Sequence, residues 1–518
     1  MDTVTTQLTT QLTTQLTTAG PVLVPLLTAG AVAARRRHDE VARVAVAGAV
    51  ALLAVAVRLA VTVVTQGPVT DPTGLLTVDA LSAFMLLVVG AVATVVALAT
   101  PAHLRVEMAA GRLDRAGRTR QLVLVQLFLA ALAGAVAAGS LGVLWVALEM
   151  TTVLTALLVG QGGGRGSDRG TAEAAWKYVI ICSTGIALAL LGTFVLNAAA
   201  HRAGAGLDWA GLTAAAPHLD PGVTRLAVLL LVLGFGAKAG LAPLHAWLPD
   251  AYSQAPAPVS ALMSGVLSSV AFYAVLRVKA VADPALGPDF ARRLLLVLAL
   301  ASIALAASLL IAQRDYTRML GYSSIETMGL LALGAAVGSP LAMAAVLLQV
   351  LGHGLVKSGL FLGAGRLRQL TGSSRIADVR ALAAREPVLA WAFGLGMLAL
   401  LGFPPFLLFV GELGIVRAGF ADGLGWVTAA ALLMLLVAAG SLLNAISRML
   451  LGAPPAGGPS GSGPAGATAL ATRRRARVEA TTAAMIVALT TCALLGVTLG
   501  PLTGLLDQAV AVATGGTP

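Results

Sequence analysis

The chain has 518 residues, of which 58% are hydrophobic and only 11% are charged, and its formal net charge at pH 7 is +11. Soluble domains carry about 25% charged residues, so this composition excludes a soluble globular protein and predicts an integral membrane protein. Both cysteines lie in apolar runs, and the sequence has no cysteine cluster, Gly-rich dinucleotide motif or paired-His haem site. We therefore expect no cofactor, no metal and no redox centre in this chain.

Apolar runs long enough to cross a bilayer recur from the beginning to the end of the chain. They predict an all-α polytopic membrane protein with about 14 transmembrane helices. In chain order, we expect helices near 19–34, 41–65, 74–99, 121–138, 140–160, 174–198, 223–248, 257–277, 291–312, 319–337, 340–365, 387–418, 425–450 and 480–500.

Two of these segments, 223–248 and 387–418, are interrupted by glycine and proline, at Gly240 and Pro243 and at Gly402–Pro405. Interrupted helices at corresponding places indicate an internal repeat built around a path at the membrane midplane. We predict two inverted five-helix repeats, each with one broken helix. The expected divisions are N-terminal peripheral helices at 1–120, a first repeat at 121–280, a second repeat at 281–452, a Gly/Pro/Ser linker with a basic run at 453–478, and a C-terminal helix at 479–518.

The arginines are distributed unevenly between alternate loops. With the N-terminus placed outside, most of them fall in the predicted cytoplasmic loops, whereas the outer loops hold few cations, among them Arg277 and Lys279. This bias predicts a multi-pass protein of the cell membrane with both termini on the outer side. It also explains the positive net charge through topology and lipid contact, so we expect no nucleic-acid partner.

Lysine is rare in this chain: only four of the 34 basic residues are lysine, and the rest are arginine. Two of the four, Lys238 and Lys357, nevertheless lie in the middle of apolar segments. Arginine cannot be deprotonated in practice, whereas the pKa of a buried lysine shifts readily. The retained lysines therefore indicate that a titratable amine is needed at membrane depth.

Other ionisable residues also fall within apolar runs. Glu149 is the only charged residue in the run 141–160, and His353 lies one helical turn before Lys357. A charge at the centre of a bilayer costs about 2.5–3.5 kcal/mol, so such residues are functional candidates by default. The bland alternative for Glu149 is a neutral carboxyl bonded to its own backbone, and for Glu412 an acid near a helix end. The functional interpretation pairs Glu149 with Lys238.

One stretch carries a longer motif. Pro243–Ala251, PLHAWLPDA, is followed by APAPVSA at Ala255–Ala261, and YSSIETMG and PPFLLFVGE occur further on. Together they resemble the antiporter-like proton-channel subunits of respiratory complex I, of multisubunit membrane hydrogenases and of multisubunit Na+/H+ antiporters. The spacing HxxxK at His353–Lys357 and the glutamate of YSSIE are most similar to the hydrogenase-4 component F and formate-hydrogenlyase-like branch.

The resemblance implies a proton path through the chain. Glu149 and Lys238 match the essential glutamate of the family's fifth helix and the lysine of its broken seventh helix. Two positions depart from the family, since Ser269 stands where a lysine or asparagine is common and Thr327 where a histidine is usual. The implied path consists of Glu149, Lys238, His245, Ser269, Thr327, His353, Lys357 and Glu412.

The sequence therefore predicts a proton-translocating membrane subunit of a hydrogenase or NADH/quinone-oxidoreductase-like complex, with the redox chemistry in other subunits. Whether the chain counts as an enzyme is open, because it has no redox site of its own. One alternative is a subunit of a multisubunit Na+/H+ antiporter. Another is a non-conducting scaffold, which the hydroxyl residues Ser269 and Thr327 favour. The expected partners are other membrane subunits, the lipid bilayer, and protons, with Na+ as the alternative ion.

Overall fold

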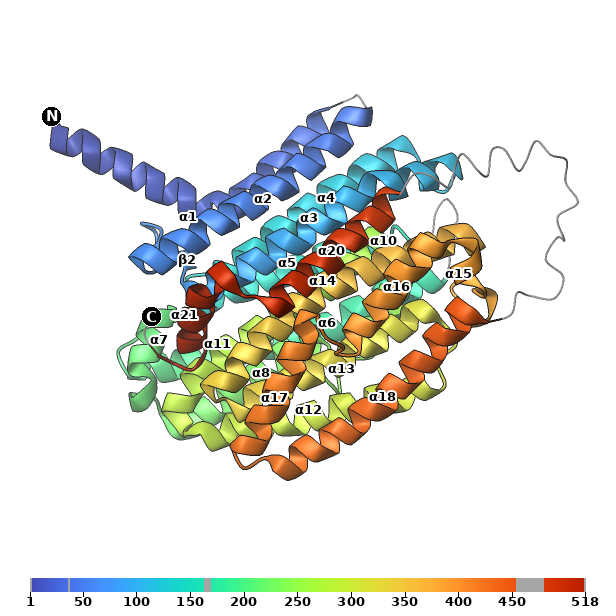
Figure 1. Cartoon of the computed structure of the whole chain (residues 1–518). Helices are drawn as coiled ribbons and strands as arrows, with labels where there is room; N and C mark the ends of the chain where they lie inside the picture. The colour runs from blue at the N-terminus through green and yellow to red at the C-terminus, as the bar shows by residue number, and fades with distance from the viewer. Residues whose placement is uncertain (1, 36–37, 163–168, 453–478, 517–518) are drawn as a thin grey trace, which may run out of the picture.

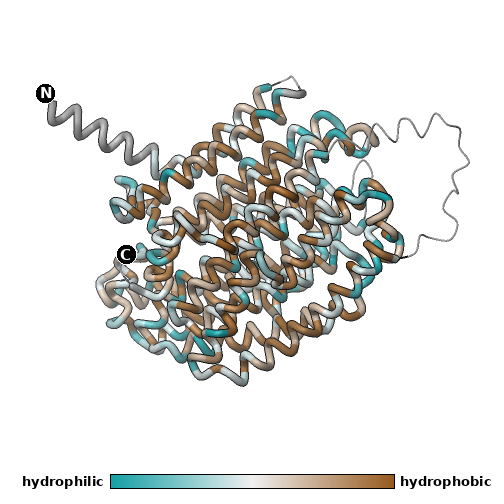
Figure 2. The backbone as a smooth tube through the Cα atoms, viewed as in Figure 1, coloured by the Kyte–Doolittle hydropathy of each residue, from teal (hydrophilic) through white to brown (hydrophobic). Residues whose placement is uncertain are grey.

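The computed structural model describes residues 2–35, 38–162, 169–452 and 479–516, which form a bundle of helices running side by side (Figure 1). Hydrophobic residues cover most of the helix lengths and hydrophilic residues gather toward the two ends of the bundle (Figure 2). Thirteen described helices are long and apolar enough to cross a membrane. These spans are α1 (Asp2–Ala34), α2 (His38–Gln66), α3 (Ala80–Ala109), α4 (Arg115–Val136), α5 (Leu141–Val159), α6 (Arg169–Arg202), α8 (Pro221–Ala239), the run of α10 (Ala257–Leu262), a π-helix (Met263–Leu267) and α11 (Ser268–Leu286), then α12 (Pro288–Ile311), α13 (Tyr316–Val337), α14 (Pro340–Thr371), α18 (Gly425–Leu451) and α20 (Ala480–Val497).

Both predicted helix breaks are present. After α8 the chain unwinds and restarts as α9 (Trp247–Gln254), and the second broken segment consists of α16 (Pro387–Leu400) and α17 (Leu407–Ala421). Gly240 and Gly402 adopt positive φ angles of 92° and 66°, which glycine reaches without strain. The prolines that follow have no N–H to continue the helix. Counting the second broken segment as one span confirms the expected total of about 14.

The two broken segments enter the bundle from opposite faces, because five spans separate the beginning of α8 from the beginning of α16. One face carries the arginines at the end of α3, the beginning of α13 and the end of α14, and we call it the arginine-rich face; its members include Arg105, Arg112, Arg318, Arg366 and Arg368. The chain is thus an all-α polytopic protein with two oppositely oriented broken helices, as the sequence predicts.

Several elements were not predicted. A short antiparallel hairpin of β1 (Val69–Thr70) and β2 (Thr77–Val78) occupies the region where the third helix was expected to begin. Asp79 caps α3 as predicted, accepting a hydrogen bond from Ser82 N, so the helix begins at Ala80 and extends to Ala109. The remaining elements are α7 (Trp209–Ala215), α15 (Leu382–Arg385), α21 (Thr503–Ala513), and the 3-10 turns Ala216–His218, Ile376–Asp378 and Gly500–Leu502. The predicted linker at 453–478 lies outside the described residues.

Glycine pairs bring helices into close contact beside the candidate residues. A Cβ atom added to Gly234 would lie 2.5 Å from the carbonyl oxygen of Gly185, so α8 and α6 meet backbone to backbone one turn before Lys238. In the same way, a Cβ on Gly265 would lie 3.0 Å from the carbonyl oxygen of Gly354. This second contact joins the π-helix to α14 next to His353. Small residues of this kind allow close packing of membrane helices.

The last span, α20, packs against both α14 and α17. Glu479 forms an ion pair with Arg366 at the arginine-rich face, with an N–O distance of 2.6 Å. Further along, a Cβ atom on Gly363 of α14 would lie 2.7 Å from the sulfur of Met485, and one on Gly496 would overlap the backbone of Pro405 in the second break. Thus α20 contacts the helix of Lys357 and the second helix break at the same time.

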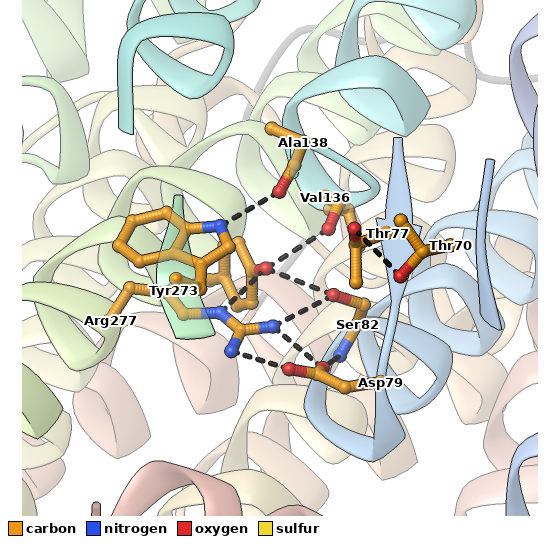
Figure 3. Close-up of polar contacts among 9 residues, drawn as sticks. Thr70, Thr77, Asp79, Ser82, Val136, Ala138, Tyr273 and Arg277 are labelled. Atoms are coloured by element: carbon orange, nitrogen blue, oxygen red, sulfur yellow. Dashed lines mark hydrogen bonds and ion pairs between the residues drawn. The ribbon is translucent and has the colours of Figure 1, made fainter. Parts of the chain in front are cut away.

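A buried ion pair fixes α11 to α3 at the face opposite the arginine-rich one (Figure 3). Arg277 donates two hydrogen bonds of 2.6 Å to the carboxylate of Asp79, one of 2.8 Å to Ser82 Oγ and one of 2.8 Å to Tyr273 Oη. Tyr273 in turn donates to the carbonyl of Val136. The assignment of Arg277 and Lys279 to an outer loop was wrong, because α11 extends to Leu286 and buries both side chains.

Asp79 remains ionised despite its burial. Burial raises the pKa of its carboxyl, but the charge of Arg277 and hydrogen bonds from Arg277 and Ser82 more than offset this, leaving the pKa below its ordinary value. Because the folded-state pKa is lowered, the pair contributes stability above the unfolded pKa of about 3.9. That contribution is lost as the pH falls through the folded-state pKa.

We expect Asp79→Asn to lower the free energy of unfolding by about 3–5 kcal/mol, because the substitution leaves Arg277 buried without its partner. The matched control is Asp289→Asn, which removes an exposed ion pair with Arg292 and should cost about 0–1 kcal/mol. Thermal unfolding of the purified variants in detergent measures both. Equal losses in the two variants would contradict the structural role of the Asp79–Arg277 pair.

Candidate functional site

Lys238 lies in the last turn of α8, immediately before the first break, and its side chain is fully buried. The amine donates a 2.8 Å hydrogen bond to the carbonyl oxygen of Leu148 and a second bond to the Thr152 hydroxyl, both on α5. A cation at this position also interacts favourably with the negative end of the α8 dipole. The lysine is therefore solvated by a carbonyl, a hydroxyl and a helix terminus.

Glu149 lies next to Leu148 on α5, and its charge acts on Lys238. However, these two residues form no ion pair within 4 Å, and one oxygen of the partly exposed carboxyl has no hydrogen-bond partner. The predicted direct ion pair between Glu149 and Lys238 is thus absent from this structure, although the two residues do lie on facing helices. The physical reason is that the Leu148 carbonyl and the Thr152 hydroxyl occupy the amine instead.

Lys357 has the same kind of environment in the second half of the chain. It is fully buried on α14, and its amine donates 2.7 Å to the carbonyl oxygen of Leu320 and also bonds the Ser323 hydroxyl, both on α13. His353, one turn earlier, is also fully buried. Its ring lies against the backbone of Ser264, but neither ring nitrogen makes a hydrogen bond of normal geometry. His353 is thus free to accept or donate through a water molecule.

Ser269 and Thr327 are both buried, but neither hydroxyl bridges to another helix. Ser269 bonds the carbonyl of Gly265 at 3.5 Å and Thr327 bonds the carbonyl of Ser323 at 2.9 Å, each on its own helix. The hydroxyls that do connect neighbouring helices are those of Ser264 and Ser324, 3.0 Å apart. The π-helix changes the residue spacing per turn and so re-aims the serines, which sequence spacing alone does not anticipate.

His245 lies within the first break and is partly exposed, with no partner for its Nδ1 atom. Two residues later, the buried indole of Trp247 donates 2.9 Å to the carbonyl of Ala237, the residue before Lys238. From Trp247 a row of edge-to-face aromatic rings runs to α6 through Tyr178 and to α14 through Tyr252 and Phe361, with centroids 5.1–5.9 Å apart. This aromatic row links the helix that carries Lys357 to the first break.

A cavity of about 500 Å³ opens at the arginine-rich face between α3, α4, α10 and α14. Polar groups on its wall include Glu107, Gln369 and the buried Gln121, whose Nε2 atom has no partner. Tyr252 also lines the cavity, and its hydroxyl lies 2.8 Å from Ser268 Oγ on α11. A polar route therefore extends from the cavity toward the buried serines of the bundle.

Asp250 holds α9 at the inner end of this route. Its carboxylate pairs with Lys177 of α6 at 3.1 Å and with Arg318 of α13 at 2.8 Å. The short helix after the first break is therefore tied to one helix of each half of the chain. Sequence analysis included Asp250 only as part of the PLHAWLPDA motif and gave it no role.

Glu412 follows the second break on α17, and its carboxylate lies over Gly402. The Gln349 side chain of α14 lies beside it. Sequence analysis also gave no proton-carrying role to Glu326 of α13, whose charge interacts with those of Glu412 and Lys357. The YSSIE motif drew attention to this glutamate only as a branch marker, because the positions of its neighbours depend on how three helices pack.

We predict that Gly402→Ala impairs the site far more than Gly423→Ala does. Both glycines have positive φ angles, so each substitution should cost about 1 kcal/mol in backbone strain. A methyl group at Gly402 would overlap the Glu412 carboxylate, whereas nothing lies within 4 Å at Gly423. Thermal unfolding and transport measurements on both variants check this, and equal behaviour would show that the position of Glu412 is unimportant.

Within the described ranges no group of three or more His, Cys, Asp or Glu side chains could hold a metal ion. Cys182 and Cys492 are both buried as free thiols.

The fold and site together define a class of protein: a polytopic membrane protein with two oppositely oriented broken helices and a line of buried ionisable side chains between them. Residues 138–438 match the family described as NADH:quinone oxidoreductase/Mrp antiporter, transmembrane region. The chain belongs to this family, which is the one that the sequence motifs resemble.

Curated relatives and solved structures agree with this assignment. The chain is 34% identical over 389 residues to the hydrogenase-4 component F homolog of Methylacidiphilum infernorum, covering 74% of this chain and 81% of that protein. It is 38% identical over 323 residues to NADH-quinone oxidoreductase subunit N of Desulforudis audaxviator, covering 61% of each. A chain of the Mrp complex from Dietzia sp. DQ12-45-1b has the same fold, with a TM-score of 0.80, 24% identity, and coverage of 96% of this chain and 97% of that one.

Proposed function

We propose that this chain is a proton-translocating membrane subunit of a hydrogenase or NADH/quinone-oxidoreductase-like complex whose redox chemistry takes place in other subunits. The observation that carries the proposal is the matched setting of Lys238 and Lys357. Each amine is buried and bonded to a main-chain carbonyl and a hydroxyl, with no carboxylate ion pair. The similarity to hydrogenase-4 component F and NADH-quinone oxidoreductase subunit N supports the same function.

The chemistry follows from that setting. A carbonyl and a hydroxyl can accept hydrogen bonds from an ammonium ion, and the hydroxyl can also donate to a neutral amine. Because no carboxylate fixes the positive charge, modest changes in local potential can shift each lysine between its two protonation states. Protons would enter from the cavity at the arginine-rich face, pass between the lysines through waters and hydroxyls, and reach Glu412 at the second break. His245, Ser269, Thr327 and His353 belong to the proposed path.

Charge in Glu149 couples this path to its surroundings. Glu149 is partly exposed on the isolated chain, so its environment depends on what lies against α5. A change there would alter the field at Lys238 and thereby its affinity for a proton. We propose that neighbouring membrane subunits supply this change, in a cell-membrane assembly with the arginine-rich face in the cytoplasm and both termini outside. The repeats proposed for 121–280 and 281–452 would each contain one lysine.

Two other functions remain under consideration. The fold is shared with the Mrp complex, which favours a Na+/H+ antiporter subunit as the second candidate. In that case vesicle acidification would respond to a Na+ gradient. A non-conducting scaffold is the third candidate, and Ser269 and Thr327 favour it because both hydroxyls bond within their own helices.

Lys238→Arg should abolish proton transport and leave assembly intact, because the charge stays while the ability to release a proton is lost. The matched control is Lys279→Arg, since Lys279 is equally buried but already paired with Asp283. Vesicles carrying each variant in place of the native chain report lumen acidification by a pH-sensitive dye, and the redox activity of the complex is followed separately. Transport at the wild-type rate in Lys238→Arg would refute the titration argument.

Ser269→Lys should change the pH dependence of transport, not only its rate, because it places a titratable group between Lys238 and His353. Ser269→Thr is the control that keeps a hydroxyl at this fully buried position. Transport is measured in the same vesicles over a range of pH. If the profile stayed the same in Ser269→Lys and His353→Ala were silent, the scaffold function would be the better explanation.

A further inference from the structure

We propose that Glu326 is a further proton-carrying residue, which connects Lys357 on α14 to Glu412 on α17. The inference rests on the proposed function, and it concerns the last part of the path. Among the described residues no hydrogen bond or ion pair joins Lys357 directly to Glu412, so a path between them needs an intermediate group. Glu326 on α13 is the ionisable side chain that interacts with both.

The position of Glu326 follows from its helix. Lys357 bonds Leu320 O and Ser323 Oγ on α13, and Glu326 comes three residues after Ser323. Residues three apart lie on one face of an α-helix. The Glu326 carboxyl therefore continues along the face of α13 that holds the lysine amine, and α13 also packs against α17, which carries Glu412.

Glu412 is held in place for such an exchange. Gly402, the positive-φ residue of the second break, leaves the space that the Glu412 carboxylate fills. Gln349 of α14 lies beside that carboxylate; it is only 1% exposed, and its Oε1 atom has no hydrogen-bond partner. An unpartnered amide oxygen at this depth is costly unless it meets a donor. A protonated carboxyl or a hydronium-bearing water supplies that donor.

Two carboxyls that interact in a low-dielectric environment cannot both be charged at low cost, so the pair is expected to hold one proton between them. In the proposed step, the Lys357 ammonium loses an N–H bond and a carboxylate oxygen of Glu326 gains an O–H bond. Glu326 then passes its proton to Glu412 and is restored as a carboxylate. Proton and charge balance in each transfer without any further reactant.

This assignment also accounts for Thr327. The family usually has a histidine there, but the Thr327 hydroxyl bonds Ser323 O on its own helix and offers no titratable group. Glu326, the preceding residue, supplies one on the same helix. His353 and Lys357 of α14 and Glu412 of α17 are the other ionisable groups of this region.

The first test is Glu326→Gln in the full chain, assembled in its native membrane complex. We expect proton transport to fall about tenfold or more, with redox activity and assembly retained. Glu326→Asp, which keeps a carboxyl, should recover part of the rate. Glu386→Gln is the matched control at an exposed carboxyl and should transport normally. Wild-type transport in Glu326→Gln would overturn the proposal.

A second measurement separates proton carriage from a packing role. Infrared difference spectra of the purified chain in lipid, recorded between two pH values, detect the C=O stretch of protonated carboxyls. We expect one such band to be lost in Glu326→Gln and to shift in Glu412→Gln, because the two groups interact. An unchanged spectrum in Glu326→Gln would also overturn the proposal.

The two levels of inference fail differently. If Lys357→Ala transported protons at the wild-type rate while the infrared coupling between Glu326 and Glu412 persisted, the proposed function would be wrong and the shared-proton pair would stand. If Lys357→Ala abolished transport but Glu326→Gln did not, the function would stand and the role of Glu326 would be wrong.

Discussion

The solvation of two buried amines by helix backbone is the constraint on which the rest of the structure depends. A lysine at membrane depth needs oxygen atoms, and a helix interior offers them only as carbonyls that already accept a bond from their own turn. Lys238 and Lys357 each share such a carbonyl, from Leu148 and Leu320, and add one nearby hydroxyl. Because this solvation uses neutral groups, the amine can bind or release a proton without breaking an ion pair.

The breaks and the glycine contacts serve this arrangement. Ending α8 at Ala239 leaves Lys238 at a helix terminus, and the close approach of Gly185 and Gly234 fixes α8 against α6. Across the molecule, Asp250 ties α9 to both halves, while Arg277 fixes the far end of α11. Between these fixed points lie the π-helix and the serines. The rigid contacts are thus at the two faces, and the adaptable hydroxyl network is in the middle.

Much of this could be predicted from the sequence, because membrane spans, breaks and intramembrane charges each leave a direct compositional trace. The spans, both breaks and the isolation of Lys238 and Lys357 in apolar runs were all evident. What could not be predicted depends on packing across helices. The preference of Lys238 for Thr152 over Glu149, the burial of Arg277, and the Ser264–Ser324 contact all require knowing which residues face each other. The π-helix has no sequence pattern that spacing rules detect, and it alone displaces the role expected of Ser269.

The attachment of α20 has an implication for how the chain is built. Its position is determined by the Arg366–Glu479 pair, by Met485 against Gly363, and by the contact of Gly496 with the second break. None of these contacts needs a peptide connection to α18. The last helix therefore behaves as a docked ligand of the bundle, and a gene split between the two would be expected to yield halves that reassemble. By the same logic, a peptide that competes for this groove would act on Lys357 and the second break together.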